Sequence, residues 1–199
     1  MSTKFEAACI RGVHRAFKLH MKFTDGLPLT FAPEAFIQGQ IALELAKLGV
    51  FVTLESPVYE ALSDAGAELR GKKSKRMGGR FDLVTYWKTM KPRLLIEVKK
   101  LRRKDAISAD AKRLRQTVGR GGSTRSGLVV VYADAKKPQT IQGRIDYAAR
   151  TKGCKLTART GPIAFNADWD GGDKWHYEVA CIRVRPNPSF KRTRLRRSA

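Results

Sequence analysis

Two acidic residues and a lysine interrupt a pair of apolar segments in the middle of the chain. The stretch "GRFDLVTYWKTMKPRLLIEVKK" covers residues 79–100 and contains Asp82, Glu97 and Lys99. Charges within a sheet are costly unless they are paired, bind a metal ion or take part in chemistry. These three residues are therefore the first candidates for a functional site.

Residues 80–88 and 93–100 are predicted to form two strands joined by a turn at "TMKP". Because side chains alternate along a strand, Glu97 and Lys99 are expected on one face and Val98 on the other. A hairpin that turns near 89–92 brings Asp82 close to Glu97. Two carboxylates at that separation repel each other strongly unless a cation lies between them.

The type of oxygen ligand favours Mg²⁺, which takes carboxylates together with waters and substrate phosphate. Lys99, one position further along the same face, would then orient the attacking water and offset charge in the transition state. The alternative is a surface ion pair between Glu97 and Lys99, with Asp82 completing a salt-bridge network. An isolated Glu-x-Lys pattern has that explanation most of the time.

The net charge favours a polyanionic partner. The chain of 199 residues has 40 Lys and Arg against 18 Asp and Glu, a formal charge of +22. Such an excess opposes compaction by self-repulsion, and nucleic acid is the commonest partner that relieves it. The final segment 186–199 is predicted to be a disordered basic tail, and subtracting its five positive charges from +22 still leaves +17.

The remaining composition excludes several classes. The cysteines Cys9, Cys154 and Cys181 form no CxxC pair, which argues against a zinc site and for a reducing compartment. The N-terminal segment has no unbroken apolar run, and no stretch is long enough to span a membrane. We therefore expect a cytoplasmic protein with no membrane partner.

Periodicity predicts an α/β fold with a mixed sheet flanked by helices. The core, about 33–134, has the order helix, strand, strand, strand, helix, strand (αβββαβ). A further helix at 139–150 and two later strands complete the sheet or form a small subdomain. We expect one domain over 1–185, with core elements and a leading helix at 4–20, 33–48, 50–56, 80–88, 93–100, 105–118 and 128–134.

Basic residues gather in two places. The segment "RGKKSKRMGGR" at 70–80 directly precedes Asp82 and could clamp a nucleic-acid backbone, although an ordinary solvated loop explains it equally well. The helix at 105–118 is expected to carry polar and basic side chains opposite its apolar face. The predicted nucleic-acid contacts from both places are Lys72, Lys73, Lys75, Arg76, Arg80, Lys112, Arg115 and Gln116.

The order of elements, with Asp82 followed by Glu97-Val98-Lys99, resembles the PD-(D/E)XK nuclease superfamily, which has the restriction-endonuclease-like fold. The resemblance covers about half of the chain. It implies that Asp82 and Glu97 bind the metal ion, that Val98 adds its backbone carbonyl, and that Lys99 is the catalytic lysine. Phe81 stands where the name-giving motif has proline, a departure that does not touch the chemistry.

The resemblance also implies a further glutamate from the first core helix. Glu34 is preferred because it lies in the first turn, ahead of the apolar face; Glu44, deeper in the same helix, and Glu55, at the end of the first strand, stay open. The same resemblance places Arg115 and Gln116 where the second helix often supplies a polar residue near the phosphate.

The resulting expectation is a magnesium-dependent endonuclease, a hydrolase of phosphodiester bonds, with Mn²⁺ able to replace Mg²⁺ and with DNA as the expected substrate. The alternative is a non-catalytic nucleic-acid-binding protein that keeps the nuclease fold. A basic module that binds an acidic protein is a third class. A homodimer is allowed by the resemblance, because many such nucleases pair to cut both strands.

Overall fold

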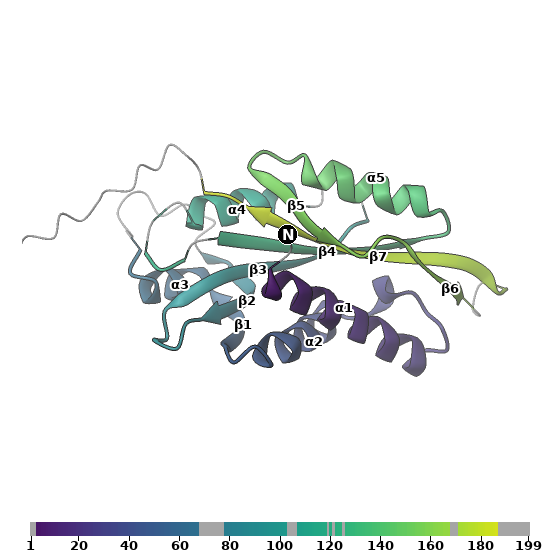
Figure 1. Ribbon diagram of the computed structural model, residues 1–199, viewed down its shortest axis with the longest axis horizontal. Coiled ribbons are helices and arrows are strands. Elements are labelled where there is room, and N and C mark those ends of the chain that lie inside the picture. The colour runs from purple at the N-terminus through teal and green to yellow at the C-terminus, as the bar shows by residue number, and fades with distance from the viewer. Residues whose placement is uncertain are drawn as a thin grey trace, which may run out of the picture.

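A seven-stranded mixed sheet with helices on both faces forms the centre of the molecule in the computed structural model (Figure 1). The structure describes residues 3–67, 78–102, 107–118, 120, 122–124, 126–167 and 171–186. Its elements are α1 (Lys4–Phe23), the 3₁₀ turn η1 (Leu29–Phe31), α2 (Glu34–Ala46), β1 (Phe51–Pro57), α3 (Val58–Asp64), β2 (Arg80–Tyr86), β3 (Pro92–Lys100), α4 (Ser108–Val118), β4 (Ser126–Ala135), α5 (Pro138–Ala149), β5 (Cys154–Arg159), β6 (Ile163–Ala167) and β7 (Asp173–Val184).

The strands lie in the order β1-β2-β3-β4-β7-β5, and β6 pairs with β7. Only the β3–β4 pair is parallel, with α4 as the connection between them; the other pairs are antiparallel. The C-terminal strands therefore complete the sheet through β7. Strand β4 lies between β3 and β7 and is buried along almost its whole length, which its continuous apolar sequence explains.

Helices α1 and α2 cover one face of the sheet, and α4 and α5 cover the other (Figure 1). The first layer is closed by a cluster that includes Val13, Ile37 and Ile96. The second layer is closed by a cluster that includes Leu114 and Val129. A helix interior would normally disfavour glycine, but α1 and α2 are in direct contact at Gly12, where an added Cβ would lie 2.5 Å from the Cα of Ile41.

The α/β class and the predicted order of core elements are confirmed, with two additions. Helix α3 lies between the strands predicted at 50–56 and 80–88, and β6 lies after the helix predicted at 139–150; neither element was predicted. Both are short, and their sequences are too brief to show a helical or alternating period clearly. Helix α3 is held by tertiary contacts, because Val58, Ala61 and Leu62 are buried in the second cluster.

Several predicted features lie outside the described residues: Lys72, Lys73, Lys75 and Arg76 of the basic segment, and the tail from residue 187 onward. Within the described part of the chain, no helix combines the length and the apolar character that crossing a membrane requires.

Candidate active site

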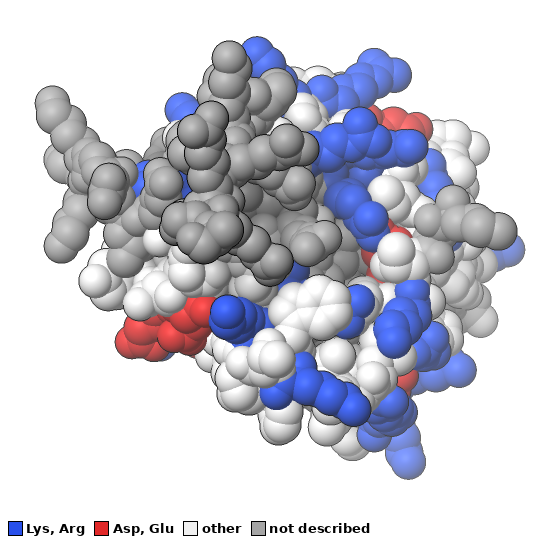
Figure 2. All heavy atoms as spheres, turned by 60° about the vertical axis from the view of Figure 1, so that its left-hand side comes forward, with Lys and Arg blue, Asp and Glu red and all other residues white. Residues whose placement is uncertain are grey.

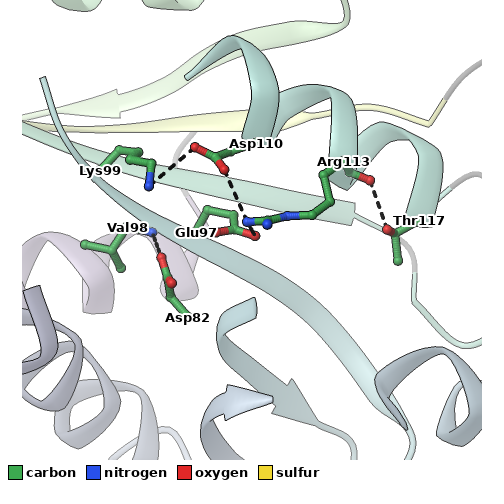
Figure 3. Close-up of polar contacts among 7 residues, drawn as sticks. All are labelled: Asp82, Glu97, Val98, Lys99, Asp110, Arg113 and Thr117. Carbon is green, nitrogen blue, oxygen red and sulfur yellow. Dashed lines mark hydrogen bonds and ion pairs between the residues drawn. The ribbon is translucent and has the colours of Figure 1, made fainter. Parts of the chain in front are cut away.

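The candidate site lies where β2 separates from β3. The antiparallel register of these strands runs from the Tyr86–Pro92 pair to the Leu83–Ile96 pair, whereas β3 continues alongside β4 as far as Lys100. Beyond Ile96, the backbone of β3 therefore needs another partner on its β2 side. The carboxylate of Asp82 supplies it, because Oδ2 accepts a hydrogen bond of 2.6 Å from the backbone N–H of Val98 (Figure 3).

Lys99 lies among several carboxylates that come from different elements. Its Nζ is 3.6 Å from Oδ2 of Asp110 on α4, and it interacts electrostatically with Glu34, Asp82 and Glu97. Burial alone would lower the pKa of Lys99, but these acidic neighbours outweigh it and raise that pKa. We refer to Glu34, Asp82, Glu97, Lys99 and Asp110 as the Lys99 cluster.

Glu97 is the most deeply buried carboxylate of the cluster, with only 1% of its surface exposed. Burial, reinforced by the charge of Asp82, raises the pKa of Glu97 to about 8. A guanidinium opposes this shift: Nη2 of Arg113 is 2.5 Å from Oε1 of Glu97 and 3.2 Å from Oδ1 of Asp110. Figure 3 shows Glu97 directed toward Arg113 on α4, with Lys99 reaching Asp110.

Glu34 and Asp82 are affected by the same excess of negative charge. Burial raises the pKa of Glu34, and the charges of Asp82 and Asp110 add to the shift. Burial also raises the pKa of Asp82 above its ordinary value, despite the hydrogen bond from Val98. Lys99 lowers both pKa values but does not cancel the shifts. The cluster would therefore be stabilised by a further positive charge.

The structure distinguishes between the glutamates that the sequence left open. Glu34 begins α2 and interacts with Lys99 and Asp82. Glu44 instead lies on α2 among cations of its own: Arg11 Nε is 3.1 Å and Arg15 Nη1 is 3.9 Å from its carboxylate. Hydrogen bonds from Lys47 and then from Arg11 hold the pKa of Glu44 below its ordinary value. Glu44 thus joins α1 to α2 and is not part of the Lys99 cluster.

Glu55 lies near the cluster in an unusual backbone conformation. It has a positive φ of 51°, and the β1–β2 register passes from Leu54–Leu83 to Ser56–Phe81 across it. Its charge contributes to the raised pKa values of Asp82 and Glu34. A strained non-glycine residue beside a buried carboxylate is often found at functional sites.

The donor chemistry fits a hard divalent cation, whereas the present arrangement does not converge on one point. Carboxylate oxygens and the Val98 carbonyl are the ligands that Mg²⁺ prefers. Among the described residues, however, no three His, Cys, Asp or Glu side chains are grouped closely enough to hold a metal ion. The contact of Arg113 with Glu97 explains part of this, because it turns that carboxylate toward α4.

The predicted basic contacts are distributed unevenly. Arg80, at the start of β2, and Lys112, on α4, are exposed. Gln116 is half-buried on α4. Arg115 packs against the β5 end of the molecule instead: a Cβ added to Gly153 would lie 2.3 Å from Arg115 Nε. The structure therefore does not bring Arg115 into the Lys99 cluster.

Sequence reasoning missed Asp110 and Arg113. Their spacing of three places them on one side of α4, and a salt bridge joins them. That spacing was the available signal, yet it identifies only a local pair; the contact with Glu97 depends on the packing of α4 over β3. Thr117, a further turn along, donates a hydrogen bond of 2.9 Å to the carbonyl of Arg113.

One face of the molecule carries many basic side chains. Figure 2 shows lysine and arginine side chains spread over much of one face, with acidic side chains confined to small areas.

No protein-family model, curated protein or solved structure matches the chain.

Proposed function

We propose that the protein is a metal-dependent nuclease that hydrolyses phosphodiester bonds of nucleic acid, with DNA as the expected substrate. The observation that carries the proposal is the Lys99 cluster: the buried Glu97 and the half-buried Glu34 and Asp82, all with raised pKa values, in a chain whose net charge is +22. The basic surface attracts a polyanion, but carboxylates repel phosphate. A divalent cation held by the cluster resolves that conflict.

Each residue of the cluster has a role in this proposal. Asp82 and Glu97 would hold Mg²⁺ or Mn²⁺, with the carbonyl of Val98 and with Glu34 as the additional glutamate. Bound there, the ion would supply polarisation of a phosphoryl oxygen and a lowered pKa of water. Lys99 orients the attacking water and offsets charge that develops on the phosphate.

The arrangement of the core supports a restriction-endonuclease-like fold as part of the same proposal. Helix α2 is followed by β1, the short helix α3, β2 and β3, then by α4 and β4, and β3 and β4 are parallel. Where the pairing of β2 with β3 ends, the Asp82 carboxylate reaches the backbone N–H of Val98. In this proposal, the metal ion and the phosphate would bind at that point.

A second function, nucleic-acid binding without catalysis, is favoured by one specific contact. Arg113 holds the carboxylate of Glu97 at 2.5 Å, and it could serve permanently as the cation that the site requires. In that case, binding would weaken steeply with salt. It would be unaffected by Glu97→Ala or Lys99→Ala, and no substrate would be cleaved.

The deciding experiment compares wild type with Asp82→Asn, which removes the negative charge but preserves size. Supercoiled, single-stranded and branched DNA, together with RNA, are incubated with Mg²⁺, with Mn²⁺ or with a chelator. We expect metal-dependent cleavage by the wild type and a loss of at least about 1,000-fold in the variant. Equal cleavage by both proteins would refute the assigned role of Asp82.

A matched control excludes a general effect of removing an acidic charge. Asp173 begins β7, and its side chain is 56% exposed beside Lys136. Asp173→Asn therefore makes the same chemical change outside the cluster, and its cleavage rate should stay within about two-fold of wild type. Salt-sensitive binding without cleavage by any of the three proteins would favour the non-catalytic alternative.

A further inference from the structure

An aromatic ring is exposed beside the Lys99 cluster on a turn that is fixed at several points. Phe31 ends η1 and is 61% exposed. Isolated exposed apolar residues are common and usually carry no meaning. The surroundings of Phe31 distinguish it from such residues.

The first distinguishing feature is the rigid attachment of η1 to the sheet. The backbone N–H and the hydroxyl of Thr30 both donate to the carboxylate of Asp134, at 2.9 and 2.7 Å. Asp134 is only 8% exposed at the end of β4, and Leu29 is buried beneath the turn. The N–H of Phe31 donates to the carbonyl of Pro28 at 2.9 Å. The ring is thus presented on a fixed backbone and loses little freedom when it binds.

The second feature is a lysine beside the ring that is also linked to the cluster. Lys100 Nζ lies 5.8 Å from the centre of the Phe31 ring; Lys100 follows Lys99 in β3, with its side chain on the other face of the sheet. Lys100 also interacts electrostatically with Glu34, which begins α2 shortly after η1. A flat apolar ring next to a cation matches the two parts of a nucleotide, because a base stacks on the ring while its phosphate meets the lysine.

We propose that Phe31 and Lys100 form a stacking platform for an unpaired base next to the cleaved bond, which makes single-stranded or frayed nucleic acid the preferred substrate. In a fully paired duplex the faces of the bases are covered by their neighbours, so the ring has nothing to stack on. This inference rests on the proposed function, since it assigns a substrate class to the same site.

The test uses single-stranded oligonucleotides and matched duplexes that carry 2-aminopurine, a base analogue whose fluorescence falls when it stacks. Binding is measured in Ca²⁺ to limit cleavage, for wild type, Phe31→Leu and Phe31→Trp. We expect wild type to prefer the single strand and to quench the probe. Phe31→Leu keeps an apolar side chain without a ring, and it should bind the single strand about 5- to 150-fold more weakly with no quenching. Phe31→Trp should retain both signals.

The control variant is Phe51→Ala. Phe51 is similarly exposed, at 57%, but it lies at the start of β1, paired with Tyr86. The Phe51→Ala variant should bind the single strand and quench the 2-aminopurine fluorescence as the wild type does. Thermal unfolding of each variant confirms that an exposed substitution leaves the fold intact.

The possible failures are distinguishable. Equal single-strand affinity and quenching for wild type and Phe31→Leu, or tighter binding of the duplex, would overturn the platform and leave the proposed nuclease function standing. Absence of any nucleic-acid binding by the wild type would overturn the proposed function and the platform together.

Discussion

Two glutamates of this protein are equally buried but have opposite electrostatic states. Glu6 on α1 and Glu97 on β3 each expose only 1% of their surface. The pKa of Glu6 lies below its ordinary value, whereas that of Glu97 rises to about 8. Burial raises the pKa of both, so the difference must come from their partners.

Glu6 is surrounded by donors. Its carboxylate accepts hydrogen bonds from the N–H of Thr3 at 2.5 Å, from the hydroxyl of Thr157 at 2.7 Å and from Arg183 at 2.7 Å. It also lies in the first turn of α1, where the helix dipole favours negative charge. Together these interactions outweigh the cost of burial and keep the carboxylate ionised.

Glu97 has Arg113 as its donor and two carboxylates, Asp82 and Asp110, as neighbours. The comparison shows that burial alone does not mark a functional carboxylate. Glu6 joins α1 to β5 and β7 and its hydrogen-bonding needs are met within the fold. Glu97 lies in an acidic cluster whose negative charge is balanced only in part by Arg113 and Lys99. A bound cation would balance the remainder.

The largest expected effect is a difference in cleavage rate between variants of the two glutamates. Glu97→Gln removes a proposed metal ligand and should lower metal-dependent cleavage by at least about 1,000-fold, equivalent to about 4 kcal/mol in the barrier. Glu6→Gln should leave the cleavage rate per folded molecule within about two-fold. Rates are measured on one substrate and normalised to the folded fraction. A similar loss in both variants would show that the contrast between the two sites has no functional meaning.

The next effect is the pH dependence of stability. The pKa of Glu97 is raised from 4.5 to about 8 on folding, so the folded state binds its proton more tightly. Its contribution to stability therefore falls as pH rises between these values, by at most about 1.4 kcal/mol per pH unit. Urea unfolding from pH 5 to 9 should show a stability difference between Glu97→Gln and wild type that grows by a few kcal/mol in favour of the variant.

The contribution of Glu6 to stability should change with pH in the opposite direction to that of Glu97. Its pKa is lowered from 4.5 on folding, so its contribution is present above that pH and is lost as the solution becomes more acidic. Wild type should lose stability relative to Glu6→Gln only below about pH 5. Parallel pH profiles for the two glutamine variants would contradict the assigned charge states.

A smaller effect concerns the cost of removing the Glu6 carboxylate at neutral pH. Glu6→Gln weakens the contacts with Thr157 and Arg183 and leaves the guanidinium without its counter-ion. Because the Arg183 side chain is 35% exposed, water partly compensates, and we expect a loss of about 2 kcal/mol in the free energy of unfolding. Thr157→Val tests the hydrogen bond separately and should cost about 1 kcal/mol.

The strands that position Asp82, Glu97 and Lys99 could be predicted from the sequence. Strand alternation placed Glu97 and Lys99 on one face, and the hairpin brought Asp82 to the neighbouring strand. The resemblance favoured Glu34 but left Glu44 open, because both lie in the first core helix. The choice depends on Arg11 and Arg15 from α1, whose contact with α2 leaves no local pattern.

The charge state of Glu97 could not be predicted from the sequence either. Arg113 lies on an expected helix, but its contact with Glu97 depends on how α4 packs over β3. The helical period indicates which side of α4 is apolar, not which strand residue its polar edge meets. Long-range polar contacts of this kind decide whether a buried carboxylate is satisfied, as at Glu6, or left available for a cation.

The smallest expected effect at neutral pH is the coupling between Arg113 and Glu97. A double-mutant cycle with Arg113→Met and Glu97→Gln measures it from the unfolding free energies. At pH 7 Glu97 is mostly protonated, because its pKa is about 8, so the coupling should be below about 1 kcal/mol. At pH 9 the carboxylate is ionised, and the coupling should rise to about 2–3 kcal/mol.

The matched cycle pairs Arg183→Met with Glu6→Gln, where the two groups are 2.7 Å apart. Glu6 is ionised at both pH values, so its coupling should stay constant within about 0.5 kcal/mol.

Mg²⁺ provides the final comparison. If Asp82 and Glu97 take up the ion, it competes with Arg113 and should reduce the Arg113–Glu97 coupling at pH 9 without changing the Arg183–Glu6 coupling. A coupling that is the same at pH 7 and pH 9 in the first cycle would mean that Arg113 holds Glu97 ionised throughout, and the site would then resemble the one around Glu6.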